Sequence, residues 1–215
     1  MTNVQYITHE NQRFGYEEGA ELALKGGCRW VQLRMKDADD GEFMAVGRRV
    51  RALCKAYRAT FVIDDRVHLV KTLQADGLHL GKLDMPVDEA RALLGDDSII
   101  IGGTANTFDD IRRLHRQGVS YIGCGPFRFT ATKKKLAPTV GLEGYRHLIT
   151  LMKSNKINIP VIAIGGILRD DIPEIMATGI SGIAVSGAVL NAVNPMDEMR
   201  KIIDEAEVGQ KLNER

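Results

Sequence analysis

The sequence predicts a single α/β domain with the (β/α)8 TIM-barrel fold, and three observations support this. Eight short β-rich runs alternate with eight longer helical patterns along the 215 residues. Such alternation, without a run of successive strands, is typical of parallel strands joined by crossover helices. Several strand runs are almost wholly apolar, as expected when both faces are buried. Two glycine-rich turns follow the last two strands, as in phosphate-binding barrels. A doubly wound open sheet is the alternative, and the count of eight favours the closed barrel.

The strands are predicted from short runs of β-branched, aromatic and other apolar residues that lead into a polar or glycine-containing segment. In chain order they are Val4–Ile7, Trp30–Arg34, Thr60–Ile63, Gly77–Leu80, Ile99–Gly102, Tyr121–Gly123, Val161–Ile164 and Gly182–Val185.

The helices are predicted from apolar residues that recur at helical spacing between these strands. In order they are Glu17–Lys25, Glu42–Tyr57, Val67–Leu73, Val87–Leu94, Phe108–Gln117, Tyr145–Ser154, Ile172–Thr178 and Pro195–Ala206. One barrel domain is expected over residues 1–207, followed by a polar tail, Val208–Arg215.

Composition narrows the function classes. The chain is 44% hydrophobic and 27% charged, and its formal net charge of +1 gives no general attraction to nucleic acid or to an anionic membrane. No apolar run approaches the ~20 residues that span a bilayer, and Met1–Thr8 does not resemble a signal peptide. Cys28, Cys54 and Cys124 are widely spaced, which favours reduced core thiols in a cytoplasmic protein over zinc ligands or disulfides. A homodimer is compatible with the fold.

The two glycine-rich turns point to a phosphorylated ligand. They lie in Val161–Ile167 and in Gly182–Gly187, each between a strand and a helical pattern. Glycine lets backbone N–H groups approach an anion closely, and the helix that follows adds its positive end. Either turn alone could simply allow a tight strand-to-helix connection. Two in succession near the end of the chain favour a phosphate site.

The segment Gln32–Lys36 carries the sharpest pattern. Strand alternation places Gln32, Arg34 and Lys36 on one side and Leu33 and Met35 on the other. A charged pair inside a barrel is costly unless it lies at the mouth with a partner. Arginine and lysine converging there would form a diphosphate clamp. An exposed edge strand is the alternative, although the neighbouring apolar residues suggest burial.

Carboxylates end two neighbouring strands. Asp64 and Asp65 follow one strand, and Asp84 follows the next. Asp65 alone would most often cap a helix. Because the ends of parallel barrel strands share one mouth, one or two of these carboxylates together with substrate phosphates could hold Mg²⁺. His79 is expected to pack or to form hydrogen bonds rather than to catalyse.

Further polar groups follow later strands. Thr104 offers a hydroxyl at the same face, and Thr130, Thr132 and Lys133 lie on a long connection that is typical of a lid or binding loop. The sequence shows no Ser-His-Asp arrangement and no His/Cys cluster for zinc or haem. Metal-assisted diphosphate chemistry therefore fits better than a hydrolytic triad.

Taken together, these residues resemble the thiamine phosphate synthase family. The matching pieces run in order along nearly the whole chain, from Gln5–Thr8 to about Asn191. They are the Q-x-R-x-K of Gln32–Lys36, the pair Asp65 and Asp84, the segment Thr130–Lys133, the Ile164–Ile167 turn and the Val185-Ser186 turn.

The resemblance implies a transferase with two phosphorylated substrates. It joins 4-amino-2-methyl-5-(diphosphooxymethyl)pyrimidine to the nitrogen of 4-methyl-5-(2-phosphoethyl)thiazole, or of its 2-carboxylate, and releases diphosphate. Ionisation of the pyrimidine C–O bond would precede attack, while Arg34, Lys36, Lys133 and Mg²⁺ neutralise the departing diphosphate. No protein nucleophile is then required.

The resemblance also implies a role for each matching position. The pyrimidine diphosphate would be held by Gln32, Arg34, Lys36, Asp64, Thr104 and Lys133, with Leu33 and Met35 in the same binding segment. Mg²⁺ would be bound by Asp65 and Asp84. The thiazole phosphate would be held by Thr130, Thr132, Gly166, Val185 and Ser186, with Ala131 in the same segment.

Asp64 is the main departure from the family pattern, which usually has Asn there. An ionised carboxylate cannot donate to a phosphate oxygen, so Asp64 is expected to be turned away, protonated or bound to Mg²⁺. Thr104 and Asn106 are smaller departures: the family commonly has Ser at the first of these positions and His at the second. The competing functions are a thiazole tautomerase, which needs no diphosphate clamp or metal, a non-catalytic sensor of thiamine phosphates, and an unrelated phosphate-binding barrel.

Overall fold

The computed structural model, which describes residues 3–129 and 139–213, confirms a closed eight-stranded parallel barrel. The strands follow one another around the ring in chain order, and β1 pairs with β8 to close it. They are β1 (Val4–Ile7), β2 (Trp30–Leu33), β3 (Thr60–Asp64), β4 (Gly77–Leu80), β5 (Ile100–Ala105), β6 (Tyr121–Cys124), β7 (Val161–Ile164) and β8 (Gly182–Val185).

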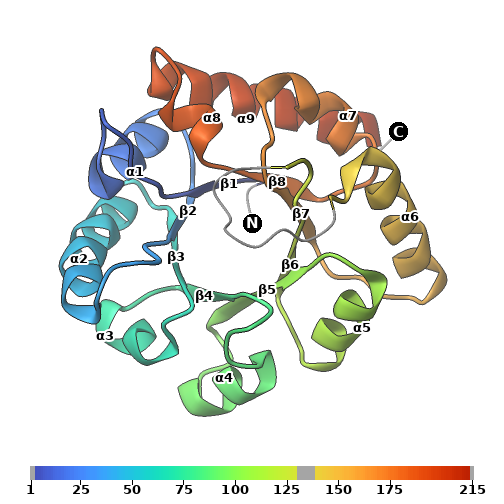
Figure 1. The fold of residues 1–215 in the computed structure, drawn as a ribbon, viewed down its shortest axis with the longest axis horizontal. Coiled ribbons are helices and arrows are strands. Elements are labelled where there is room, and N and C mark those ends of the chain that lie inside the picture. The colour runs from blue at the N-terminus through green and yellow to red at the C-terminus, as the bar shows by residue number, and fades with distance from the viewer. Residues whose placement is uncertain (1–2, 130–138, 214–215) are drawn as a thin grey trace.

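A ring of helices surrounds the barrel, as Figure 1 shows along the barrel axis. The helices are α1 (Tyr16–Lys25), α2 (Asp40–Ala56), α3 (Val70–Leu73), α4 (Val87–Leu94), α5 (Phe108–Arg116), α6 (Gly141–Ser154), α7 (Ile172–Met176), α8 (Gly187–Leu190) and α9 (Pro195–Asn213). Two short 3₁₀ helices, Val67–Leu69 and Arg169–Asp171, precede α3 and α7. None of the helices in residues 3–129 and 139–213 combines the length and the apolar character needed to cross a membrane.

Strand alternation divides the core into two layers. Inside the barrel lies a cluster of six buried side chains: Ile7, Trp30, Val62, Tyr121, Ile162 and Ala184. The residues between them along the strands, such as Val31, Leu33 and Ile183, point outwards and pack against the helices. Cys28, Cys54 and Cys124 are free and buried, as predicted.

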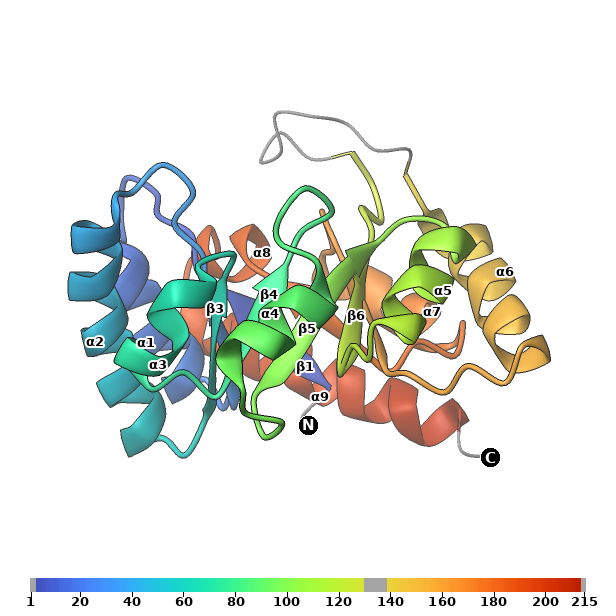
Figure 2. The ribbon, with the colours of Figure 1, turned by 90° about the horizontal axis from the view of Figure 1, so that it is seen from below.

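All strands point the same way, so their carboxyl ends share one face of the barrel. In Figure 2 this face is at the top of the view, where the loops after the strands project beyond the sheet. Polar residues that follow different strands along the sequence are thereby gathered at one mouth. This is the arrangement that the site prediction requires.

The last two helices differ from the prediction. The single turn α8 was not predicted, because four residues are too few to show helical periodicity. The final helix α9 continues to Asn213, whereas the sequence predicted that it ends at Ala206 and that a tail begins at Val208. The prediction of a tail is therefore wrong for Val208 to Asn213. Gly209 explains the continuation: a Cβ placed there would lie 2.6 Å from Met176 Cβ, so α9 still packs on α7 at this point.

Candidate active site

β2 presents its side chains as its alternation predicts. Gln32 lies on the barrel side and is only 1% exposed, while Leu33 and Met35 are buried in the layer between barrel and helices. The Leu33 and Met35 side chains therefore do not face the mouth, and only their backbone could reach a ligand there. Gln32 Nε2 is buried without a hydrogen-bond partner in the described part of the chain. This amide nitrogen is therefore a buried donor whose hydrogen-bonding capacity is unused.

Thr8 fixes the backbone of Arg34. The Thr8 hydroxyl accepts a hydrogen bond from the Arg34 N–H (3.0 Å) and lies 3.4 Å from the Arg34 carbonyl oxygen. The Thr8 N–H donates to the Gln32 carbonyl oxygen (2.9 Å). Sequence reasoning missed Thr8, because its role depends on the pairing of β1 with β2.

The side chain of Arg34 reaches the end of β3. Its Nε lies 3.5 Å from Asp64 Oδ2, and both side chains are largely buried. Burial raises the pKa of Asp64 to about 6; Arg34 and Lys36 act against that rise, and Asp84 and Asp65 add to it. Arg34, Lys36 and three carboxylates are thus close enough to interact at the mouth, as the sequence predicts.

Asp65 has an unusual backbone conformation. Its φ is +66°, in the left-handed region that few residues other than glycine adopt, although Asp tolerates it better than most. The conformation is held by a hydrogen bond from the Asp65 N–H to the His79 carbonyl oxygen (2.9 Å). The pKa of Asp65 is raised by desolvation and then by the negative charge of Asp84. Two carboxylates therefore repel one another here, a situation that a bound cation would relieve.

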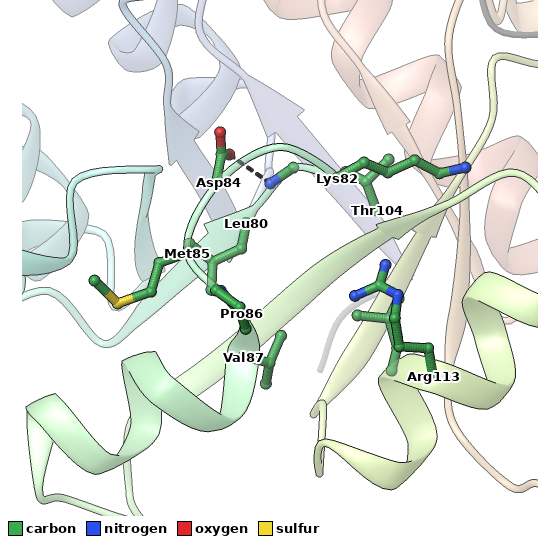
Figure 3. A pocket seen from close by; sticks show the side chains of 10 residues that line it. Leu80, Lys82, Asp84, Met85, Pro86, Val87, Thr104 and Arg113 are labelled. Carbon is green, nitrogen blue, oxygen red and sulfur yellow. Dashed lines mark hydrogen bonds between the residues drawn. The ribbon is translucent and has the colours of Figure 1, made fainter.

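Asp84 closes a tight turn after β4. Its Oδ2 accepts the Gly81 N–H (2.6 Å), shown by the dashed line in Figure 3, and its own N–H donates to the Gly81 carbonyl oxygen (3.3 Å). Lys82, inside this turn, forms an ion pair with Asp110 at the start of α5 (2.5 Å). Burial of Asp110 acts to raise its pKa, but hydrogen bonds from Lys82 and from the Asn106 and Thr107 backbone N–H groups, just before α5, hold the pKa below its ordinary value.

Beneath this turn is a cavity of about 50 Å³, whose lining includes Lys82, Asp84, Thr104 and Arg113 (Figure 3). It has room for little more than a few water molecules, so it cannot hold a pyrimidine or thiazole ring.

His79 links Thr104 to the barrel interior. Its Nε2 lies 3.0 Å from Thr104 Oγ1, and its Nδ1 lies 3.0 Å from the Tyr121 hydroxyl, which also accepts a hydrogen bond from Gln5 Nε2 (3.4 Å). The prediction that His79 forms hydrogen bonds is confirmed. Burial raises the pKa of Tyr121, so its hydroxyl stays protonated.

The turn after β7 has the positive φ angles that its two glycines allow. Gly165 and Gly166 have φ values of +100° and +71°. The Arg128 N–H donates to the Gly165 carbonyl oxygen (3.1 Å), and a Cβ on Gly166 would lie 2.5 Å from Arg128 Cγ. The Arg128 guanidinium in turn pairs with Asp171. Sequence reasoning missed this support for the turn.

The turn after β8 leads directly into α8. Val185 is buried against the helices, and the Ser186 carbonyl accepts the N–H groups of Val189 (3.0 Å) and Leu190 (3.1 Å). Gly166 and Ser186 follow neighbouring strands, so both lie at the mouth. Four further predicted site residues fall outside the described residues: Thr130, Ala131, Thr132 and Lys133.

Comparison with known proteins gives a consistent match. The model of a family described as thiamine monophosphate synthase matches residues 4–189. A relative named thiamine-phosphate synthase from Phocaeicola vulgatus is 56% identical over 201 residues, covering 94% of this chain and 96% of the relative. One from Flavobacterium johnsoniae is 45% identical over 212 residues, covering 99% and 95%.

A solved structure agrees with these sequences. Thiamine phosphate pyrophosphorylase from Pyrococcus furiosus superposes with a TM-score of 0.86 at 31% sequence identity, covering 97% of this chain and 96% of that one. The range that the family model matches includes the strands from β1 to β8 and the site residues from Gln32 to Ser186. This chain therefore belongs to the thiamine monophosphate synthase family.

Proposed function

We propose that this protein is a thiamine-phosphate synthase, a transferase that joins the pyrimidine diphosphate to the thiazole phosphate and releases inorganic diphosphate. The relatives carry this name, and the residues at the mouth suit both substrates. The observation that carries the proposal is the grouping of Arg34 and Lys36 with Asp64, Asp65 and Asp84 on one side of the mouth. The glycine-rich turns after β7 and β8 lie on another part of the same face.

The pyrimidine diphosphate would bind on the β2–β5 side. Gln32 offers its unpartnered Nε2 to the pyrimidine, and Thr104 presents a hydroxyl whose orientation His79 sets. The Arg34 guanidinium and the Lys36 ammonium face the diphosphate. Lys133, outside the described residues, is proposed to add a third positive charge.

Mg²⁺ is proposed as the cofactor at Asp65 and Asp84. The residues fit this ion: both are hard oxygen donors, and the pKa of Asp65 is raised first by burial and then by the negative charge of Asp84. In the described ranges no group of three or more His, Cys, Asp or Glu is arranged to hold a metal ion. Two carboxylates would leave the other positions to phosphate oxygens and water, as Mg²⁺ commonly has them. When bound, the ion supplies electrostatic stabilisation of the diphosphate.

The thiazole phosphate would bind at the β7 and β8 turns. The left-handed backbone of Gly166 and the absence of a Cβ leave N–H groups accessible to an anion, and Ser186 adds a hydroxyl. Val185 contributes only backbone, because its side chain is buried. Thr130, Ala131 and Thr132 are proposed to complete this subsite from outside the described residues.

These placements suggest how the chain promotes the reaction. Breaking the pyrimidine C–O bond leaves its electron pair on the diphosphate, where Arg34 and Lys36 stabilise the developing charge. The thiazole nitrogen then forms the new C–N bond with its own electron pair. Because the substrate supplies the nucleophile, none is needed from the protein.

The test is to mix the purified protein with both substrates, with Mg²⁺ or with EDTA, and to follow thiamine phosphate by thiochrome fluorescence. Product that depends on the metal supports the synthase. No product from folded protein that still binds thiamine phosphate would favour a sensor. Isomerisation of a thiazole carboxylate without condensation would favour a tautomerase.

A further inference from the structure

The loop between β1 and α1 is attached to the end of α8 through Asn11. Asn11 Nδ2 donates to the Leu190 carbonyl oxygen (3.3 Å) and to Asn191 Oδ1 (2.9 Å). Its Oδ1 accepts the N–H groups of Arg13 and Phe14, each at 2.9 Å. Asn11 therefore shapes its own loop with one side-chain atom and holds α8 with the other.

Arg13 makes a second attachment to the segment that follows α8. Its Nη1 donates to the Ala192 carbonyl oxygen (2.9 Å) and its Nη2 to the Val193 carbonyl oxygen (3.2 Å). The guanidinium carbon also lies 4.7 Å from the centre of the Phe14 ring. Asn11 and Arg13 together join the loop after β1 to the end of α8 and to the segment that follows it. These contacts lie near the seam where β1 and β8 close the barrel (Figure 1).

α8 needs support from outside because it is only four residues long. A helix of one turn has too few internal hydrogen bonds to be stable by itself. One side of it is supported by α1, where a Cβ on Gly19 would lie 2.9 Å from Leu190 Cδ1. The Asn11 and Arg13 contacts hold its carboxyl end. Its other end continues directly from the Val185-Ser186 turn, so a shift of α8 would move that turn.

We propose that Asn11 and Arg13 are positioning residues that hold the Val185-Ser186 turn in the conformation that binds the thiazole phosphate. Their side chains are committed to backbone carbonyls and to Asn191, so they act through α8 and not by touching the substrate. The proposal rests on the proposed function for the identity of the phosphate. The new element is that binding of the thiazole phosphate, but not of the pyrimidine diphosphate, depends on the loop between β1 and α1. The sequence analysis did not identify this loop.

The test compares Asn11→Ala and Arg13→Met with a matched control, Asn3→Ala. Asn3 also links the two ends of the chain, through Gln210 Oε1 (3.2 Å), but it lies just before β1, at the opposite end of the barrel. Binding of the thiazole phosphate is measured by calorimetry, and KM for each substrate by turnover. Asn11→Ala and Arg13→Met should each weaken thiazole phosphate binding about three- to tenfold, the effect of losing one or two hydrogen bonds. KM for the pyrimidine diphosphate and the properties of the Asn3 variant should not change. Arg13→Lys should restore part of the affinity.

Three results with the variants would overturn the proposal. They are unchanged thiazole phosphate affinity in both site variants, an equal rise in KM for both substrates, and an equal loss of affinity for the unphosphorylated thiazole alcohol. A wild-type protein that does not bind thiazole phosphate would overturn it too. If the proposed function is wrong, the wild-type protein binds thiazole phosphate but forms no thiamine phosphate. In that case the calorimetry still decides the role of Asn11 and Arg13.

Discussion

Arg34 Nε and Asp64 Oδ2 lie 3.5 Å apart at the mouth of the barrel, both largely shielded from solvent. The carboxylate thus faces the guanidinium that is proposed to bind diphosphate. Asp64 is therefore not turned away from the clamp, which was one of the three expectations for it. Its pKa, raised to about 6 by burial, favours the protonated form below that pH. Above that pH the carboxylate is charged, and the nearby Arg34 partly offsets the cost of burying this charge.

The first prediction concerns stability against pH. A carboxyl whose pKa is higher in the folded than in the unfolded chain favours folding at low pH, and this stabilisation is lost as pH rises through the folded value. For Asp64 the window runs from the ordinary value of 3.8 to about 6. The quantity to follow is the free energy of unfolding of Asp64→Asn minus that of the wild type. From pH 4 to pH 8 this difference should rise by about 2 kcal/mol, because only the wild type loses the contribution of Asp64. Urea denaturation at several pH values measures this, with the exposed Asp37→Asn as control. A gap that does not change with pH would contradict the raised pKa.

The same substitution tests the diphosphate clamp. An ionised carboxylate about 4 Å from a phosphate would cost on the order of 4 kcal/mol at an effective dielectric constant of 20. Asp64→Asn should therefore bind inorganic diphosphate at least about tenfold more tightly at pH 8, and the gain should shrink towards pH 5. Calorimetry with and without Mg²⁺ measures both. Weaker Mg²⁺ binding in the variant would instead make Asp64 a metal ligand, and no change in either would remove it from the site.

Much of this site could be predicted because it depends on strand alternation and parallel direction. The two faces of β2 followed from the order of Gln32–Lys36, and the carboxylates after β3 and β4 had to share a mouth. Contacts between segments far apart in sequence could not be predicted. Asn11 reaches α8 across 179 residues, and its partner helix has no periodicity of its own.

Asp84 should determine the response to Mg²⁺. A cation held by Asp65 and Asp84, as proposed above, would relieve the repulsion that adds to the effect of burial on the pKa of Asp65. A ligand that binds only the folded chain raises Tm. Asp84→Asn keeps an oxygen for the Gly81 N–H but lacks the charge. Its Mg²⁺ affinity, read from Tm against Mg²⁺ concentration, should fall at least about tenfold. Asp109→Asn, at a side chain 91% exposed, should respond like the wild type. Equal Mg²⁺ responses in all three proteins would place the metal elsewhere.

Gly166 and Gly118 form a matched pair that separates backbone strain from the phosphate site. Their φ values are +71° and +72°, so alanine is about equally strained at both. A Cβ on Gly118 meets no atom within 4 Å, whereas on Gly166 it lies 2.5 Å from Arg128 Cγ. Gly118→Ala should thus lose about 1 kcal/mol of unfolding free energy without affecting ligands.

Gly166→Ala should lose more, because Arg128 must move and its guanidinium is paired with Asp171. Movement of Arg128 also disturbs the Gly165 carbonyl that accepts its N–H, and with it the N–H groups of the turn. Thiazole phosphate affinity should therefore fall about tenfold or more in Gly166→Ala only, while diphosphate affinity is kept in both variants. Calorimetry with each ligand, beside urea denaturation, makes the comparison. If the two alanine variants bind thiazole phosphate equally well, the turn after β7 serves only the fold, and the phosphate must be held by the turn after β8 without it.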